Sequence, residues 1–491
     1  MPLRVFNYLT RGFDRFRPQS PQRVAQEQVR VHVCGPTLHD HAHLGHARTY
    51  VSMDVVLRHL RECGYRVHHV RSHGDLGHRA EAGVRRRVGS EALHDGSSPL
   101  EVVDGLIRSF EDDMDRLGVV RPNLTPRATG HIPDIIAWIE TFLDLDYAYE
   151  ADGTVSCSAD RLPSYGELSR AVLGAGGEEA ASGAAAGARP DDFPLWSPAD
   201  PSDPMAWPSP WGRGVPSWPL SCSVMTAKHL GPSFEIHGGD VEDSITHLDQ
   251  QLALSEAYHR VAPVQVWLLV GPLRVNGRKM NHRLGNFLTI KDALRLYSPE
   301  AIRLFVLSEH YRSPMEFSRE ALQAAQRSVN RLHRTGHLLQ RRMREALPLN
   351  GAGTAALSNV SSLEVYRARF RAAMDDDFNT PDALGVIFEL MDEVNRTLEQ
   401  GPEEISLGTL SAMDKLLRDL AGGVLGLLPA EPGALVGEDL VVDLVETLLA
   451  LRAQRREAKD WAGADQISNR LDQLGISVLD GPFDTTWRLR E

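Results

Sequence analysis

The sequence predicts an α/β fold: a doubly wound parallel sheet that is split by an insertion and followed by an α-helical C-terminal half. Near the start of the chain, residues 29–33 alternate as in a strand, residues 47–64 have the apolar spacing of a helix, and residues 65–71 form a second short strand. An α/β pattern returns over about residues 220–312. Strand, helix and strand in this order make the βαβ unit with which doubly wound folds begin.

The segments around these two blocks have their own signals. The first strand is expected to end at Gly35-Pro36, and the next helix to begin near Gly45. Residues 92–145 have helical spacing. The Gly- and Ala-rich residues 172–189 are predicted to be a flexible surface insert. Residues 190–219 hold many prolines and half of the eight tryptophans, so we expect an ordered, packed loop there.

The C-terminal part is predicted to be helical. Residues 316–400 and 440–475 have helical periodicity with few turn signals, and residues 401–437, which contain Gly401-Pro402, are expected to link the two helical parts.

Composition bounds the class of protein. With 491 residues, 42% hydrophobic and 24% charged, the chain is long enough for about three domains. No apolar h-region follows Met1 and no apolar run approaches the roughly 18 residues of a membrane helix, so we expect a cytoplasmic protein. Four scattered cysteines are too few for a disulfide framework. The net charge of −13 neither indicates nor excludes a nucleic-acid partner.

Two distant motifs point to a nucleotide site. His43-Leu44-Gly45-His46 follows the first strand at a helix start, where backbone N–H groups and the helix dipole favour a phosphate. More than 200 residues later, residues 277–287 carry the basic run Arg278-Lys279 and His282-Arg283. Cations there would stabilise the anionic transition state of attack on a phosphate. Either motif alone could be a histidine-rich loop or a basic surface turn; their occurrence in this order favours catalysis.

These motifs resemble the HIGH and KMSKS signatures of class I aminoacyl-tRNA synthetases, and Cys34-Gly35-Pro36-Thr37 resembles the cysteinyl branch of that class. The resemblance runs almost end to end, and its other matching stretches are residues 6–11, 131–133, 147–150, 165–169, 209–223, 235–239, 310–314, 374–381, 458–462 and 480–487.

The resemblance implies a Rossmann-like catalytic domain in two halves (1–125 and 216–315), a connective insertion (126–215), a tRNA-stem-contact domain (316–400) and an anticodon-binding-like domain (401–491). It implies an ATP-dependent ligase, monomeric, that joins L-cysteine to tRNA(Cys) with Mg²⁺ accompanying ATP. The catalytic residues would be His43, His46, Lys279, His282 and Arg283. Nucleotide contacts would come from Thr37, Gly45 and Met280, and amino-acid contacts from Gly35, Thr37 and Trp218.

The family also binds one zinc ion per subunit through two Cys, one His and one Glu, which implies the positions Cys34, Cys222, His247 and Gln251 in this chain. Residues 247 and 251 are one helical turn apart and share a face, as two ligands of one ion require. Thiolates are soft ligands that suit zinc. The carboxamide of Gln251 replaces a carboxylate, so the site loses one negative charge. Without a metal, Cys34 and Cys222 would simply be buried, inert thiols.

Further departures cluster near the expected active site. The second lysine position of the KMSKS-like loop is His282, Pro219 and Ser221 replace a His and a Glu, and residues 72–78 and 240–246 also diverge. The pattern indicates a divergent paralogue, and three functions stay open. The first is a cysteine–tRNA ligase, the second a tRNA-independent ligase that joins an activated amino acid to a small amine, and the third a non-catalytic tRNA-binding protein.

Overall fold

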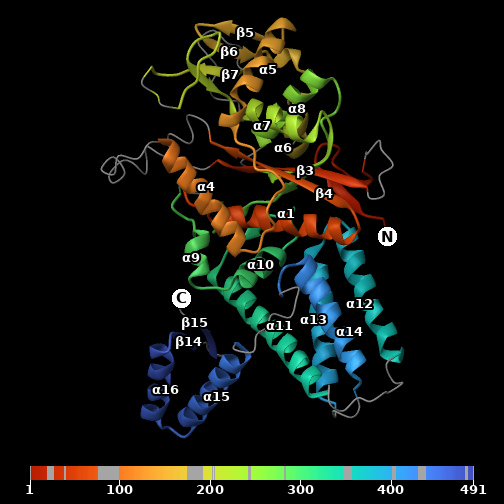
Figure 1. Ribbon diagram of the computed structural model, residues 1–491, viewed down its shortest axis with the longest axis vertical. Helices are drawn as coiled ribbons and strands as arrows, with labels where there is room; N and C mark the ends of the chain where they lie inside the picture. Colours follow the sequence, from red (N-terminus) through yellow and green to blue (C-terminus); the bar gives the residue numbers. More distant parts are fainter. Residues whose placement is uncertain are drawn as a thin grey trace.

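The computed structural model describes the fold of most of the chain (Figure 1). The described residues are 2–18, 27–37, 40–75, 99–173, 192–201, 203, 205–241, 245–280, 284–346, 357–400, 405–428, 438–480 and 485–489. Within these residues, no helix is both long and apolar enough to cross a membrane.

A four-stranded parallel sheet forms the centre of the catalytic half, in the order β10-β9-β3-β4. Its strands are β3 (Gln28–Thr37), β4 (Arg66–Gly74), β9 (Phe234–Asp240) and β10 (Val264–Val270). The predicted parallel sheet is therefore confirmed. The first strand does not end at Gly35-Pro36 as expected, because β3 continues through these residues with a shift of register between Cys34 and Thr37.

Helices cover both faces of this sheet, as Figure 1 shows. On one side lie α1 (Leu44–Glu62) and α10 (Pro299–Leu307), and on the other α7 (Trp218–Leu230) and α8 (Ile245–His259). The chain leaves β3 for β4 on one side and later adds β9 on the other side of β3. The crevice at the carboxyl ends of β3 and β9 is thus the topological switch point, where open α/β sheets bind their ligands.

The insertion is built on an antiparallel sheet in the order β5-β6-β7-β8. Its elements are α5 (Ile132–Asp144), β5 (Ala148–Ala151), β6 (Thr154–Cys157), α6 (Glu167–Leu173), β7 (Phe193–Pro198) and β8 (Gly214–Pro216). The described part of the Trp-rich segment 190–219 is packed, with Trp196 fully buried, and it contains two strands and the start of α7 rather than only a loop; residues 190, 191, 202 and 204 lie outside the described residues. Most of the predicted flexible insert, residues 174–189, lies outside the described residues.

Smaller elements complete the catalytic half. The helical prediction for 92–145 holds for α4 (Pro99–Arg116) and α5, whereas residues 117–127 between them are not helical. The remaining elements are the hairpin β1 (Arg4–Asn7) with β2 (Gly12–Arg15), the sheet β12 (Arg278–Lys279), β11 (Leu273–Val275) and β13 (Met315–Glu316), and helix α9 (Ile290–Leu294).

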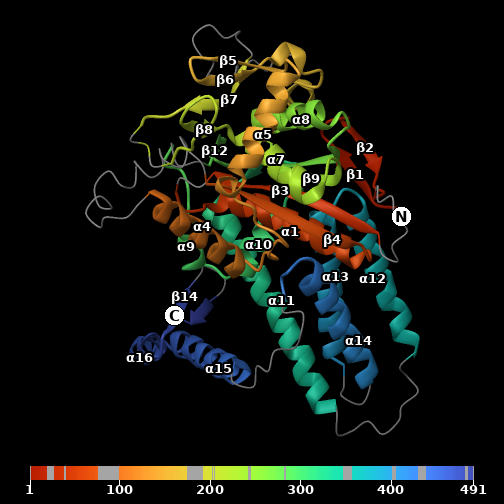
Figure 2. The same cartoon turned by 45° about the horizontal axis from the view of Figure 1, so that its top comes forward.

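The C-terminal half is helical, as predicted. A bundle contains α11 (Arg319–Ala346), α12 (Leu357–Asp375), α13 (Thr380–Leu398) and α14 (Leu407–Leu417), followed by a π-helical turn (Arg418–Val424). A separate unit of α15 (Glu438–Glu457), α16 (Trp461–Gln473), β14 (Ile476–Asp480) and β15 (Thr485–Leu489) lies at the opposite end of the molecule from the insertion (Figure 2).

Helix α14 corrects the prediction that residues 401–437 are a link. Ser406 caps this helix by accepting a hydrogen bond from the backbone N–H of Thr409. Its apolar face, with Leu410, Met413 and Leu417, is buried in the bundle core. Gly408 lies in the first turn of this helix, where it does not interrupt the buried apolar face.

Candidate active site

Three metal-type donors converge at the switch point. Cys34 ends the regular part of β3, Cys222 lies on α7 and His247 lies on α8. The Cys34 Sγ is 3.7 Å from the His247 Nε2, and the three donor atoms all lie within 4.8 Å of one another. Val29, Val31 and Val33 face the α1 side, so the alternation of β3 turns Cys34 to the side covered by α7 and α8. The structure therefore brings these three predicted residues together.

Gln251 lies one turn beyond His247 on α8 and is 2% exposed. Its Oε1 has no hydrogen-bond partner among the described residues, which is unusual for a buried carbonyl oxygen. Trp218 stacks on His247 with ring centroids 5.7 Å apart. The two buried sulfurs and the imidazole nitrogen form a donor set that fits a divalent, thiophilic metal.

The two cysteines differ in their protonation. A hydrogen bond from Cys222 lowers the pKa of the Cys34 thiol well below its ordinary value, while burial raises the pKa of the Cys222 thiol. The lowered pKa of Cys34 favours its thiolate over that of Cys222, and a thiolate is the form of cysteine that binds metals.

A chain of buried polar groups surrounds the pair, and the sequence reasoning assigned no role to it. The His237 Nε2 is 3.5 Å from the Cys34 Sγ, and the His237 and His32 Nδ1 atoms are 3.5 Å apart. The His32 Nε2 is 3.1 Å from the Ser72 Oγ, which lies 3.6 Å from the Cys222 Sγ. Burial lowers the pKa of His32 to about 3, so this imidazole is neutral and can orient its neighbours. The signal was present, because strand alternation places residues 32 and 34 on one face.

The first nucleotide motif forms the N-terminus of α1. His43 is the N-cap: its Nδ1 accepts a hydrogen bond from the Gly45 N–H at 3.0 Å, and the His46 Nδ1 accepts from the His43 N–H at 3.1 Å. Because both Nδ1 atoms are acceptors, each neutral ring carries its proton on Nε2. A Cβ on Gly45 would lie 2.7 Å from the His43 ring, so this cap requires glycine.

The second motif begins at a tight hairpin. Asn276 and Gly277 have φ values of 53° and 73°, the conformation of a two-residue turn, and they join β11 to β12. Lys279 on β12 forms an ion pair with Asp240 at the end of β9, with the Nζ and Oδ1 3.1 Å apart. Met280 is buried and its N–H donates to the Leu273 carbonyl. His282 and Arg283 lie outside the described residues.

The two motifs are joined through the backbone. His43 and Thr289 form a β-bridge, and the segment after the second motif adds two hydrogen bonds, from Leu44 N–H to Leu288 and from Ile290 N–H to Ala42. At the other end of the site, a Cβ on Gly35 would lie 1.6 Å from the Ser72 carbonyl oxygen, so the close approach of β3 and β4 requires glycine there. The structure describes the backbone of Thr37 in β3 but not its side chain.

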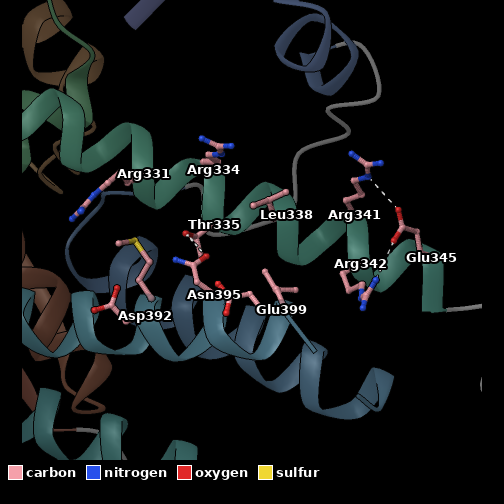
Figure 3. A pocket seen from close by; sticks show the side chains of 12 residues that line it. Arg331, Arg334, Thr335, Leu338, Arg341, Arg342, Glu345, Asp392, Asn395 and Glu399 are labelled. Atoms are coloured by element: carbon pink, nitrogen blue, oxygen red, sulfur yellow. Dashed lines mark hydrogen bonds and ion pairs between the residues drawn. The ribbon is translucent and has the colours of Figure 1, made fainter. Parts of the chain in front are cut away.

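A groove of about 640 Å³ lies outside the catalytic half, between α11 and α13 (Figure 3). One wall of the groove carries three exposed arginines of α11, Arg331, Arg334 and Arg341. They are spaced about one and two helical turns apart. The opposite wall carries Asn395 and Glu399 from α13 and its C-cap. A row of arginines on one helix is the kind of surface that contacts phosphates.

Together, the parallel sheet, the capped His43–His46 helix and the Lys279 hairpin define a class I aminoacyl-tRNA synthetase. Residues 20–327 match the class I (C) tRNA synthetase catalytic domain, 369–429 the DALR domain, and 441–488 the cysteinyl-tRNA ligase anticodon binding domain. The chain belongs to the cysteinyl-tRNA ligase family.

Individual relatives agree over the whole length. A cysteine–tRNA ligase of Alkalilimnicola ehrlichii is 41% identical and one of Chlorobium luteolum is 38% identical, each over 99% of this chain and 99% of the relative. Among solved structures, Mycobacterium tuberculosis methionyl-tRNA synthetase in complex with methionyl-adenylate shares the fold with a TM-score of 0.62 and 14% identity, covering 84% of this chain and 93% of that one. An Agrobacterium radiobacter LeuRS–tRNA complex covers 97% of both chains with a TM-score of 0.59 and 13% identity.

Proposed function

We propose that this protein is a cysteine–tRNA ligase that activates L-cysteine with ATP and transfers the cysteinyl group to tRNA(Cys). The observation that carries the proposal is the convergence of Cys34, Cys222 and His247 at the switch point of the sheet. A Cys₂His cluster beside the nucleotide motifs, at the same edge of the sheet, fits an enzyme that activates a thiol-bearing amino acid with ATP.

The thiol end of the site is formed by Cys34, Cys222 and His247, with the Gln251 Oε1 as a weak fourth donor. Zinc bound there would supply a thiophilic Lewis acid that distinguishes cysteine from serine. The neutral Gln251 reduces repulsion toward a substrate thiolate and also weakens metal retention. Trp218, stacked on His247, shields this end from water. Gly35, whose Cα is approached closely by β4, would contact the amino acid through its backbone.

The phosphate end is formed by the start of α1 and the hairpin loop. The cap bonds present the Nε2–H groups of His43 and His46 as donors toward phosphate oxygens, beside the positive end of the helix dipole. Lys279 must leave Asp240 to stabilise charge on the α-phosphate during adenylate formation, with His282 and Arg283 as further cations. Thr37, Gly45 and Met280 contribute to the nucleotide contacts, and Mg²⁺ accompanies ATP.

The helical half supplies the tRNA surface in this proposal. The arginines of the α11 groove offer phosphate contacts to the tRNA stem, and residues 401–491 include the unit that reads the anticodon. We propose that the enzyme acts as a monomer in the cytoplasm.

Pyrophosphate exchange profiled over the twenty standard amino acids tests the proposal. Cysteine should support exchange, serine should not, and Cys222→Ser should weaken the preference for cysteine with little effect on ATP binding. A preference for another amino acid, or turnover only with a small amine, would instead establish the tRNA-independent ligase. Binding of tRNA without any exchange would establish a non-catalytic protein.

A further inference from the structure

A second group of metal-type donors lies on the opposite side of the sheet from the thiol site, where α1 ends. His59 and Cys63 are one turn apart on α1 and its C-cap, and Asp375 is the last residue of α12. The His59 Nε2 is 3.0 Å from the Asp375 Oδ1 and 3.5 Å from the Cys63 Sγ. The three donor atoms all lie within 4.8 Å of one another. His59 and Asp375 are 2% and 3% exposed.

The donor separations of this group are close to those of metal ligands: the His59–Cys63 distance falls within the range of a zinc site, and the His59–Asp375 distance is shorter by a few tenths of an ångström. In a tetrahedral zinc site with bond lengths of about 2.0–2.3 Å, neighbouring donor atoms lie roughly 3.3–3.7 Å apart. A His–Asp hydrogen bond accounts for the 3.0 Å contact, and helical spacing brings Cys63 beside His59. Together they direct the carboxylate, the imidazole and the thiol toward one point. An ion placed among the three atoms uses a lone pair from each.

The surroundings also suit a cation. The Arg371 Nε lies 3.6 Å from the Asp375 Oδ2, so one carboxylate oxygen faces an arginine while the other faces His59. This is the arrangement of a ligand held in place by an outer partner. The Phe378 ring contacts His59 edge-on at 6.0 Å and closes the apolar side, while Cys63 is only half-buried and leaves an entry path.

We propose that His59, Cys63 and Asp375 form a three-ligand zinc site, separate from the thiol-selecting site, that joins the catalytic half to the helical bundle. Zinc takes the Nε2, Sγ and one carboxylate oxygen, the Cys63 proton passes to solvent, and water fills the fourth position. Helix α1 starts at the phosphate-binding cap and ends at this site. The ion therefore fixes the helix against α12, next to Asp377, which accepts hydrogen bonds from Phe6 N–H, Tyr311 and Arg312.

Zinc content of the full-length protein tests the stoichiometry. After chelator treatment and reloading with Zn²⁺, Cys63→Ser and Asp375→Asn should each hold one equivalent fewer than the wild type. Asp376→Asn is the matched control for the carboxylate, because the neighbouring Asp376 is exposed and pairs with Arg4 outside the cluster. Equal zinc content in wild type and Cys63→Ser would overturn the proposal.

Cobalt spectroscopy locates the site independently of the thiol-selecting cluster. In a Cys34→Ser/Cys222→Ser background, the remaining cysteines are Cys63 and Cys157. Co²⁺ should give a thiolate charge-transfer band that disappears on adding Cys63→Ser and survives Cys157→Ser. No band in a folded background protein, or loss of the band with Cys157→Ser alone, would contradict the site. If the background protein does not fold, the zinc count of the single variants decides.

Discussion

The ion pair between Lys279 and Asp240 makes a specific prediction about ATP use. In the described structure the Nζ and Oδ1 are 3.1 Å apart and the side chains are 18% and 21% exposed. If Lys279 serves the triphosphate, binding of ATP in a productive form must break this pair. Asp240→Asn should therefore ease ATP binding, because the lysine no longer has to be withdrawn from a carboxylate.

The size of the effect follows from the geometry. At 3.1 Å and an effective dielectric constant of about 20, the Coulomb attraction alone is about 5 kcal/mol. Desolvation, the lost freedom of two side chains and the residual exposure oppose it, and partly exposed pairs retain about 1 kcal/mol net. Since about 1.4 kcal/mol is a factor of ten, the KM for ATP in pyrophosphate exchange should fall roughly fivefold.

A double-mutant cycle shows whether the effect runs through the lysine. Lys279→Ala alone should lower the exchange rate by roughly 100-fold, the scale on which loss of one transition-state donor acts. In that background Asp240→Asn should bring no gain in ATP binding. A KM that is unchanged or raised by Asp240→Asn alone, or a gain that persists without Lys279, would refute the reasoning.

Three further predictions concern the metal, the RNA surface and stability. Gln251→Glu places a charged carboxylate where the Gln251 Oε1 has no hydrogen-bond partner among the described residues. The affinity for zinc, measured by chelator competition, should therefore rise about tenfold. An unchanged affinity would show that residue 251 does not contact the metal. Arg331→Glu/Arg334→Glu should weaken tRNA binding and lower its salt dependence, seen in filter binding at several salt concentrations, while leaving cysteine-dependent pyrophosphate exchange intact. Burial raises the pKa of Asp113 to about 6, so its contribution to stability is present below about pH 4 and is lost as the pH rises through 6. In urea denaturation, the free energy of unfolding of Asp113→Asn should gain about 2–3 kcal/mol relative to wild type between pH 4 and pH 7. Parallel pH profiles of the two proteins would contradict this.

The fold was predictable where side-chain periodicity decides it. The apolar alternation of β3, the helical spacing of α1 and the long helices of the C-terminal half are all read correctly from local pattern. Boundaries depend on tertiary contacts and were less accurate. Strand β3 continues through Gly35-Pro36 because it keeps pairing with β4, and the glycine at residue 35 allows β4 to approach closely there. Helix α14 forms because the bundle buries its apolar face.

The sequence predicted which side chains could bind a metal, but it did not predict the side-chain contacts between distant elements of the site. Cys34, Cys222 and His247 meet as the motif positions implied. The pairing of Lys279 with Asp240 joins residues 39 positions apart across two sheets, and no local spacing encodes it. The buried polar chain of His237, His32 and Ser72 beside the cysteines also depends on which elements the fold brings together. The same holds for the His59–Cys63–Asp375 cluster. Sequence periodicity identifies which face of a helix or strand is buried, whereas the contacts between two such faces are known only from the structure.

Aminoacylation of a tRNA(Cys) transcript with radiolabelled cysteine tests the central claim most directly. Purified, zinc-loaded protein should charge the transcript with cysteine in an ATP-dependent reaction, and Lys279→Ala should reduce the rate by about 100-fold while the protein stays folded. Folded wild-type protein that forms no cysteinyl-tRNA under these conditions would contradict the account.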